Sequence, residues 1–351
     1  MTGTVTEEKT ARLRKLLEDA RRAAVVTHTR PDGDAVGSAS AMAYWLGRNG
    51  RTDVRMIIPN AMPRFLGFIT AECCPDRVIQ YDTDPEAAFE WIGGCDLIIC
   101  LDASGFSRME SMKEALEASG ARKVLIDHHI DPSEQDFDLV FSETEISSTC
   151  ELLFWILLSM EGATEASGIP MPVLRALLAG MTTDTNNFAN SVFPGTFEMA
   201  SMMLSAGVDR DGILSELYNR CRENRLRMTG YVLKDKLRIL PGGAAYFVIR
   251  AGELAEYDIR DGEMEGIVNM PLTLDSVRLS IFLREDDGFF RVSIRSKRGT
   301  SAFRLASGYF HGGGHEQASG GRLYFPGDIP DASQAEAFLE RVTGEFLETE
   351  K

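Results

Sequence analysis

The amino-acid sequence predicts an α/β protein, with a parallel sheet covered by helices on both faces and then a smaller α/β domain. Three observations support this prediction. Short apolar runs alternate with helical patterns from Ala23 to Ile126, which is typical of strand–helix–strand units. Helical patterns dominate from Ser148 to Tyr231. A break at Pro241-Gly242-Gly243 is followed by new strand patterns.

The elements of the first domain are assigned from hydrophobic period and turn residues. Glu7–Arg22 has apolar residues at helical spacing and is expected to form an amphipathic helix. The fully apolar run Leu97–Leu101 is expected to be a buried strand. Further strands are expected at Ala23–Thr27, Val54–Ile58, Arg77–Gln80 and Lys123–Ile126, and helices at Ala35–Arg48, Asp84–Trp91 and Met109–Ala118.

The rest of the chain divides into a helical region and a second set of strands. Helices are expected at Glu151–Met160, Pro172–Met181, Phe197–Ser205 and Ile213–Tyr231, and strands at Ala245–Ile249, Val277–Leu283 and Phe290–Ile294. A chain of 351 residues usually forms more than one domain. We therefore predict a first domain at 1–207, a helical linker at 208–240 and a second domain at 241–351.

Composition and charge narrow the class of protein. No apolar run is long enough to span a bilayer, and the N-terminus has no apolar signal-peptide core, so a cytoplasmic protein without membrane contact is expected. The six cysteines show no paired zinc-ligand spacing and are expected to be reduced. A net charge of -16 argues against binding of long duplex nucleic acid. An acidic protein can still bind an anion if bound metal ions invert the local charge.

The first polar cluster is residues 28–35 (HTRPDGDA), between an expected strand and an expected helix. Ligands of open α/β sheets bind at the carboxyl ends of strands, so His28, Asp32 and Asp34 are candidate ligands. By itself, Asp-Gly-Asp is better explained as a turn with an aspartate helix cap. An EF-hand calcium loop is excluded, because Val36 and Ala43 stand where it needs polar ligands.

Three further candidate sites also lie at the ends of expected strands or helices. Asp102 directly follows the apolar run ending at Leu101, and Asp127-His128-His129 directly follows the run ending at Ile126. Asp184 lies at the end of an expected helix. Taken singly, Asp102 is explained equally well as a cap, and the two histidines as a polar loop.

The clusters together predict a metal site. Several carboxylates in one crevice would repel each other and raise their pKa values, and cations would remove that penalty. Carboxylate and imidazole ligands without thiolate suit manganese, with cobalt, iron, zinc or magnesium as alternatives. A paired site holds its two metal ions roughly 3.5–4 Å apart and binds a phosphate between them.

At this point the sequence resembles the DHH phosphoesterase superfamily. The resemblance rests on His28-x-x-Pro31-Asp32-x-Asp34, the strand-terminal Asp102, Asp127-His128-His129 and Asp184-Thr185, in the family's order. It implies His28 and Asp32 on a first metal ion, Asp34, His128 and Asp184 on a second, and Asp102 bridging both. It also implies that His129 faces the substrate phosphate and that Asp127 acts mainly as an orienting residue. Asn186 departs from the glycine of many relatives, which leaves the shape of that loop open.

The second domain resembles the DHHA1 domain, which forms a substrate-binding wall in relatives. The matching residues are Arg295-Ser296 after an expected strand and Gly312-Gly313-Gly314-His315. A glycine run admits close backbone approach to a phosphate, and an arginine can fork onto phosphate oxygens. A flexible loop alone would also explain the glycines. His311 departs from the expected asparagine, and we interpret it as structural.

A DHH domain followed by DHHA1 looks most like the nano-RNase/pAp phosphatase group. The resemblance thus implies a two-metal hydrolase of short oligonucleotides or small nucleotides, with Arg295 and His129 stabilising phosphate charge. The alternatives are a pyrophosphate or polyphosphate hydrolase, a cyclic-dinucleotide phosphodiesterase and a non-catalytic nucleotide sensor. A homodimer is compatible with the sequence, which does not determine the oligomeric state.

Overall fold

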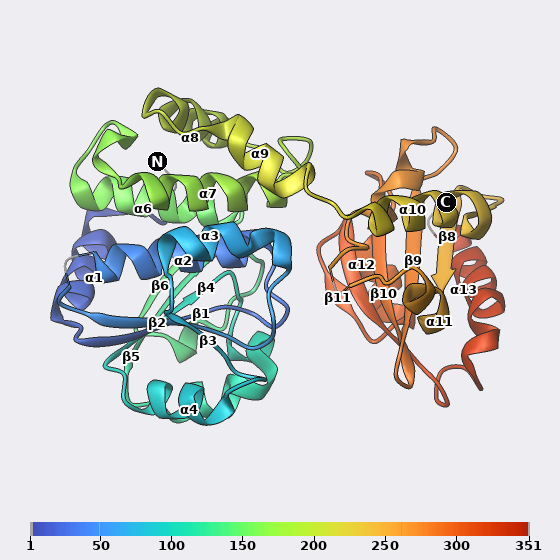
Figure 1. Ribbon diagram of the computed structural model, residues 1–351, viewed down its shortest axis with the longest axis horizontal. Coiled ribbons are helices and arrows are strands. Elements are labelled where there is room, and N and C mark those ends of the chain that lie inside the picture. The colour runs from blue at the N-terminus through green and yellow to red at the C-terminus, as the bar shows by residue number, and fades with distance from the viewer. Residues whose placement is uncertain (1–2, 49, 261, 350–351) are drawn as a thin grey trace. The chain divides into compact units, whose positions relative to one another are not determined.

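The computed structural model describes residues 3–48, 50–260 and 262–349, so the outer ends of the predicted domains at 1–2 and 350–351 lie outside the described residues. The chain divides into two compact units, Met1–Arg220 and Cys221–Lys351, each with a six-stranded sheet (Figure 1). The division falls within the predicted linker, 208–240.

The sheet of the first unit is entirely parallel, in the order β3-β2-β1-β4-β5-β6. Strand order reverses between β1 and β4, and open α/β sheets bind ligands at such a switch point. The apolar run of β4 is buried along its whole length, as a strand covered on both faces requires. The strands are β1 (Arg22–Val26), β2 (Asp53–Ile58), β3 (Val78–Gln80), β4 (Leu97–Leu101), β5 (Arg122–Asp127) and β6 (Leu139–Ser142).

Helices cover both faces of this sheet, as Figure 1 shows for α2 and α4 on opposite sides. Two apolar cores result, one on each face. One face carries α1 (Glu7–Asp19), α2 (Gly33–Gly47), α3 (Gly67–Cys73), α6 (Thr149–Glu161), α7 (Met171–Asp184), α8 (Pro194–Ser205) and α9 (Arg210–Tyr218), and the other α4 (Pro85–Gly93) and α5 (Lys113–Ala118). Short 3₁₀ helices lie at Arg64–Leu66, Phe106–Met112, Glu134–Asp136 and Ala166–Gly168.

The sheet of the second unit is mixed, in the order β11-β12-β10-β9-β8-β7, with only β8 and β9 parallel among the described strands. α12 and α13 pack on one face, α10 and α11 on the other. The elements are α10 (Glu223–Tyr231), a π-helical turn (Val232–Lys236), β7 (Arg238–Leu240), β8 (Ala244–Ile249), α11 (Ala251–Glu256), a 3₁₀ helix (Ile267–Thr273), β9 (Leu279–Asp286), β10 (Phe289–Ser296), α12 (Ala302–Tyr309), β11 (Gly313–Gly314), β12 (Ala318–Tyr324), a 3₁₀ helix (Ala332–Gln334) and α13 (Ala335–Thr349).

The predicted fold class is confirmed, and two predicted helices are wrong in part. The helix expected at Met109–Ala118 begins only at Lys113, because Glu110 has a non-helical backbone with φ +39° and Phe106–Met112 forms a 3₁₀ helix. The single helix expected at Ile213–Tyr231 is two helices, α9 and α10, because the chain leaves helical geometry at Asn219 and is extended at Arg222. Sequence patterns also did not reveal β6, β7, β11, β12 or the helices α3 and α11 to α13. No helix in the described ranges combines the length and the apolar character needed to cross a membrane.

Two glycines bring α2 and α7 into close contact. A Cβ atom on Gly37 would lie 2.6 Å from the Ala176 carbonyl oxygen, and one on Gly180 would lie 2.3 Å from Cys150 Sγ and 2.9 Å from the Gly33 carbonyl oxygen. Asp34 lies in the first turn of α2, and Asp184 ends α7. The close crossing therefore sets the distance between these two candidate ligands.

We expect Gly180→Ala to lower the free energy of unfolding by about 1–3 kcal/mol, because the added methyl group overfills the crossing. The control is Gly93→Ala in α4, where an added Cβ meets no atom within 4 Å. That control should be neutral or slightly stabilising, because alanine favours a helix over glycine. Urea unfolding followed by circular dichroism measures both, and equal stabilities would contradict the close-contact argument.

Candidate metal centre

The predicted ligands of the first unit meet at the switch point of the sheet. His28 follows β1, Asp102 follows β4, and Asp127 ends β5, so three adjacent strands deliver side chains to one edge. The start of α2 and the end of α7 add aspartates from the helical layer. Three groups have ligand atoms within 4.8 Å of one another: His28, Asp32 and Asp102; Asp34, His128 and Asp184; and Asp102, His128 and His129.

The first group is held by a helix cap and by a backbone carbonyl. His28 Nδ1 donates to the Thr29 carbonyl oxygen at 3.0 Å, so Nε2 faces the carboxylates. Nε2 lies 3.5 Å from Asp102 Oδ2 and 3.9 Å from Asp32 Oδ1. Asp32 is also the N-cap of α2, accepting from two backbone N–H groups. The cap and the candidate ligand are thus the same side chain.

The second group converges on the imidazole of His128. Its Nε2 atom lies 3.7 Å from Asp184 Oδ2 and 3.9 Å from Asp34 Oδ2. The Asp34 side chain is 1% exposed, and Asp184 is half-buried. Nε2 also lies 3.6 Å from Asp102 Oδ1.

Asp102 joins the two groups through separate oxygens. Oδ2 faces His28 of the first group, and Oδ1 faces His128 of the second. The residue has φ +57°, a left-handed conformation that costs free energy for most residues other than glycine. Backbone strain at a buried carboxylate between two ligand groups is typical of a functional position.

The N-terminal turn of α6 is a third contributor, which the sequence patterns did not reveal. The backbone N–H groups of Thr149 and Cys150 donate to the two oxygens of Asp34 at 2.7 and 2.8 Å. The Thr149 hydroxyl donates to Asp102 Oδ1 at 3.1 Å. A helix N-terminus favours negative charge, so α6 stabilises both carboxylates where they converge. Only Ser148, a typical N-cap, marked this turn in the sequence.

A buried glutamate fastens that turn. Glu151 is 1% exposed and accepts from the Ser147 backbone N–H at 3.1 Å, from the Ser147 hydroxyl at 2.5 Å and from the Thr196 hydroxyl at 2.8 Å. These bonds tie the start of α6 to the start of α8. Thr149 is therefore held rigidly against the candidate ligands.

His129 of the third group and the neighbouring Asp127 form a hydrogen-bonded pair. His129 Nδ1 donates to Asp127 Oδ1 at 2.8 Å, and Asp127 is fully buried. Burial opposes protonation of His129, but the bond to Asp127 and the charge of Asp102 outweigh it and raise the pKa of His129. The sequence analysis also missed Arg108, an exposed cation close enough to oppose that protonation.

The electrostatics of the cluster fit divalent cations. Burial, and then repulsion from Asp102 and Asp184, raise the pKa of Asp34 well above its usual range. Burial, and then Asp32 and Asp102, do the same for Asp184. Burial opposes protonation of His28, but Asp102 and Asp32 outweigh it and raise its pKa to about 9. Shared cations would relieve these repulsions and take the place of such protons. Within the described chain, Asp127 Oδ2 is buried without a hydrogen-bond partner.

Two neighbouring predicted residues of β10, Arg295 and Ser296, lie on opposite faces of the strand. Arg295 Nη1 donates to the Ile294 carbonyl oxygen at 2.9 Å and the Ser319 carbonyl oxygen at 3.4 Å, and burial lowers its pKa. Ser296 points to the opposite face of β10, because side chains alternate along a strand. Its hydroxyl is buried and donates to the Thr300 carbonyl oxygen at 2.6 Å, which explains Ser296 as a structural residue.

The glycine run Gly312-Gly313-Gly314 has a structural cause in the β11–β12 pair. A Cβ atom on Gly312 would lie 2.0 Å from the Gly320 carbonyl oxygen, and Gly314 has φ +133°. Phosphate binding by the run stays a prediction. His315 is exposed at the tip of this hairpin, and its backbone N–H donates to the Ala318 carbonyl oxygen at 2.8 Å.

Two departures from the family pattern have physical explanations. Asn186 has φ +48°, and asparagine enters the left-handed region more readily than most residues other than glycine. His311 Nε2 lies 2.8 Å from Asp328 Oδ1, which agrees with our interpretation of His311 as structural.

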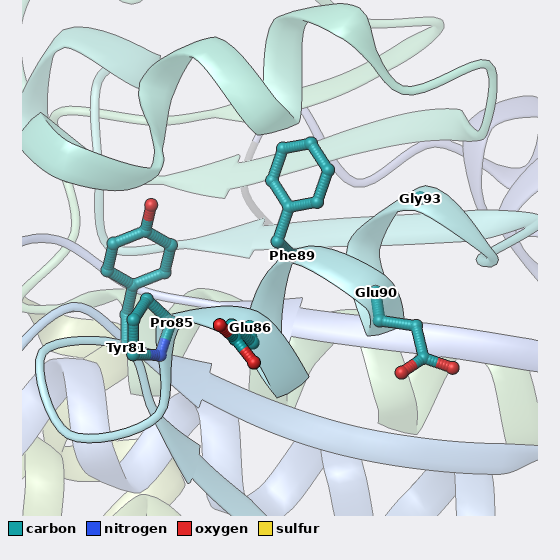
Figure 2. A pocket seen from close by; sticks show the side chains of 6 residues that line it. All are labelled: Tyr81, Pro85, Glu86, Phe89, Glu90 and Gly93. Carbon is teal, nitrogen blue, oxygen red and sulfur yellow. The ribbon is translucent and has the colours of Figure 1, made fainter.

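A separate surface pocket lies beside α4 and contains none of the predicted site residues (Figure 2). Its lining is largely apolar, and Phe89 is 62% exposed. Figure 2 shows the side chains of Tyr81, Pro85, Glu86, Phe89 and Glu90 that line it. This pocket is therefore separate from the candidate metal ligands.

Comparison with known proteins matches both units. The model of the DHH family, N-terminal domain, matches residues 22–181, and that of the DHHA1 domain matches residues 243–346. The bifunctional oligoribonuclease and PAP phosphatase NrnA of Bacillus subtilis is 28% identical over 301 residues, covering 85% of this chain and 88% of that protein. The cyclic-di-AMP phosphodiesterase GdpP of the same species is 28% identical over 203 residues, covering 56% of this chain and 30% of that protein.

A solved structure is similar over the whole chain. The crystal structure of an exopolyphosphatase-related protein from Bacteroides fragilis has a TM-score of 0.90 and 32% sequence identity. The similarity covers 100% of this chain and 99% of that one.

We expect Thr149→Val to weaken divalent-cation binding by about 10- to 100-fold, because Asp102 loses the hydroxyl that orients it. Valine keeps the volume and the backbone N–H group, and Thr149→Ser should restore affinity. Calorimetric titration of metal-stripped protein with manganese chloride measures the effect. The control is Thr52→Val, which removes a buried hydroxyl bonded to the Ala20 carbonyl oxygen at the amino end of β2. Equal affinities of Thr149→Val and wild type would show that Asp102 is oriented without Thr149.

Proposed function

The chain belongs to the DHH phosphoesterase family, and on that premise we propose that it hydrolyses very short oligonucleotides to mononucleotides, 3′-phosphoadenosine 5′-phosphate (pAp) to AMP, or both. The observation that carries the proposal is the convergence of carboxylate and imidazole ligands on the two oxygens of Asp102. The substrate class is supported by relatives named as oligoribonuclease and PAP phosphatase, which match most of the chain.

We propose two divalent cations as cofactors, most readily manganese, with cobalt, iron, zinc or magnesium as alternatives. His28, Asp32 and Asp102 would hold one, and Asp34, Asp102, His128 and Asp184 the other. When bound, such a pair supplies positive charge to a phosphate and lowers the pKa of water. DHH phosphoesterases depend on metal ions, and the groups described above have the donor atoms to bind them.

The proposed roles of His129 and Asp127 follow from their hydrogen bond. Asp127 accepts from Nδ1 of His129 and so fixes the orientation of the ring, and in the proposed function Nε2 would face the substrate. A raised pKa favours the protonated ring, and an Nε2–H group would donate to a phosphate oxygen. Charge that develops on the phosphate during hydrolysis would be stabilised there.

We propose that the second unit recognises the remainder of the substrate. Arg295 would bind a phosphate oxygen, and Gly312–His315 would contact the nucleotide through the close approach that glycine allows and through the exposed His315 ring. The net charge of -16 favours a small substrate that reaches the cations over a long duplex that needs a basic surface.

A second candidate is the hydrolysis of pyrophosphate or polyphosphate, which would use the same ligands. The whole-chain similarity to an exopolyphosphatase-related protein favours keeping it. A cyclic dinucleotide is a third candidate, supported by relatives whose own chains are matched over only 30%. A substrate panel separates all three.

With manganese, we expect purified protein to cleave pAp and a linear dinucleotide faster than long RNA, pyrophosphate or cyclic di-AMP. Turnover should disappear on chelation and return with manganese, because phosphate charge is then neutralised. Asp102→Ala should lose nearly all turnover on every substrate and keep its circular dichroism spectrum. Full turnover after metal removal verified by elemental analysis would rule out the metal-dependent reaction. Pyrophosphate cleaved faster than both nucleotides would favour the second candidate.

Arg295→Ala should reduce kcat/KM for pAp by roughly 10- to 100-fold, the usual cost of losing one charge-assisted hydrogen bond. Bis-p-nitrophenyl phosphate should suffer less, because it lacks the distal part of the substrate. The matched control is Arg298→Ala, an exposed arginine in the turn after β10. Equal losses on both substrates would place Arg295 in the chemical step instead of in recognition.

A further inference from the structure

Two phenylalanine rings stack at the surface of the first unit, just beyond the end of α7. The ring centroids of Phe188 and Phe197 are 5.4 Å apart, with an angle of 20° between the planes. Phe197 is 54% exposed in the first turn of α8, and Phe188 is half-buried beneath it. A single exposed phenylalanine is ordinary on a protein surface, so the surroundings of the stack decide its meaning.

Hydrogen bonds connect the stack to the candidate metal centre from two sides. Phe188 donates its backbone N–H to the Thr185 hydroxyl at 3.0 Å, and Thr185 directly follows Asp184. Thr196, the neighbour of Phe197, donates its hydroxyl to Glu151 at 2.8 Å. Glu151 lies in the same turn of α6 as the backbone N–H groups that hold Asp34. Phe188 therefore follows the helix end that carries Asp184, and Phe197 lies at the start of the helix that Glu151 fastens to the turn holding Asp34.

The loop that presents Phe188 is strained but ordered by side chains. Asn186, Asn187 and Phe188 have φ values of +48°, +56° and +67°. Arg210 Nη2 donates to Asn187 Oδ1 at 2.7 Å, and its guanidinium carbon lies 5.9 Å from the Phe188 ring centroid. Asn186 and Asn190 are exposed in the same loop. The surface thus combines an aromatic face, a cation and amide groups.

From this combination we propose that Phe197, supported by Phe188, is the platform on which a nucleobase of the substrate stacks. The proposal rests on the proposed function, because it places the base of a nucleotide whose phosphate lies at the candidate metal centre. Every base has an aromatic face, so such a platform binds bases without reading their sequence. The exposed amides of Asn186 and Asn190 in the same loop offer donors and acceptors that suit the edge of a stacked base.

This platform would assign recognition of the base to the first unit, which also holds the metal ligands, and would leave the other phosphate of pAp to Arg295 in the second unit. Recognition of the base and chemistry at the phosphate would then depend on one rigid set of helix ends. A polyphosphate offers no base, so the platform also distinguishes the two leading substrate candidates.

The test compares pAp with ribose 3′,5′-bisphosphate, which carries the same phosphates and no base. For Phe197→Ala we expect KM for pAp to rise by about tenfold or more, with a smaller change in kcat. KM for ribose bisphosphate should stay at the wild-type value, and Phe197→Trp should preserve KM for pAp. Phe89→Ala in α4 is the matched control, since Phe89 is also an exposed phenylalanine, at 62%.

The outcomes separate the platform from the proposed function. An unchanged KM for pAp in Phe197→Ala, or equal losses on both compounds, would overturn the platform and leave the hydrolase proposal intact. A loss of thermal stability in Phe197→Ala beyond that of Phe89→Ala would assign the ring to packing and also overturn it. Failure of the wild type to cleave pAp and dinucleotides would overturn the proposed function itself.

Discussion

Mutual repulsion among the carboxylates of Asp34, Asp102 and Asp184 is the constraint on which the rest of the first unit depends. Burial and this repulsion raise the pKa values of Asp34 and Asp184, so the cluster needs compensating positive charge. The protein supplies part of it through imidazoles and through the N-terminal turn of α6, which donates two backbone N–H groups and a hydroxyl. Divalent cations are suited to supply the remainder.

The architecture explains how such an unfavourable cluster is assembled. The carboxyl ends of parallel strands lie at one edge, so β1, β4 and β5 deliver their following residues to the same place. The helical layer contributes Asp34 and Asp184 because glycines let α2 and α7 cross closely. The remaining adjustment is made locally: Asp102 adopts a left-handed backbone conformation that aims its two oxygens at different ligand groups.

The same helix ends connect the ligand cluster to candidate recognition features. Glu151 joins the start of α6 to the start of α8, and Thr185 joins the end of α7 to the loop of Phe188. These hydrogen bonds restrict how far the two phenylalanine rings can move relative to the ligand cluster. In the proposed function, a strongly acidic chain would bind an anionic nucleotide because the attraction to cations is local and stacking adds to it.

The sequence by itself determined the features that depend only on consecutive residues. The run Leu97–Leu101 is so apolar that only a buried strand suits it, and Asp102 and Asp127-His128-His129 directly follow such runs, so their common location was predictable.

Tertiary structure alone decided features that join distant segments or depend on side-chain direction. Thr149 contacts Asp102 across 47 positions, Ser296 turns into the core while Arg295 does not, and the expected helix at Ile213–Tyr231 breaks. β12 was missed because its segment Ala318–Tyr324 is rich in small residues, which a close β11 partner requires and no hydrophobic pattern reveals. A local sequence pattern indicates burial and the hydrophobic period of a helix or strand. Contacts between distant segments depend on how those segments pack together, which no single segment specifies.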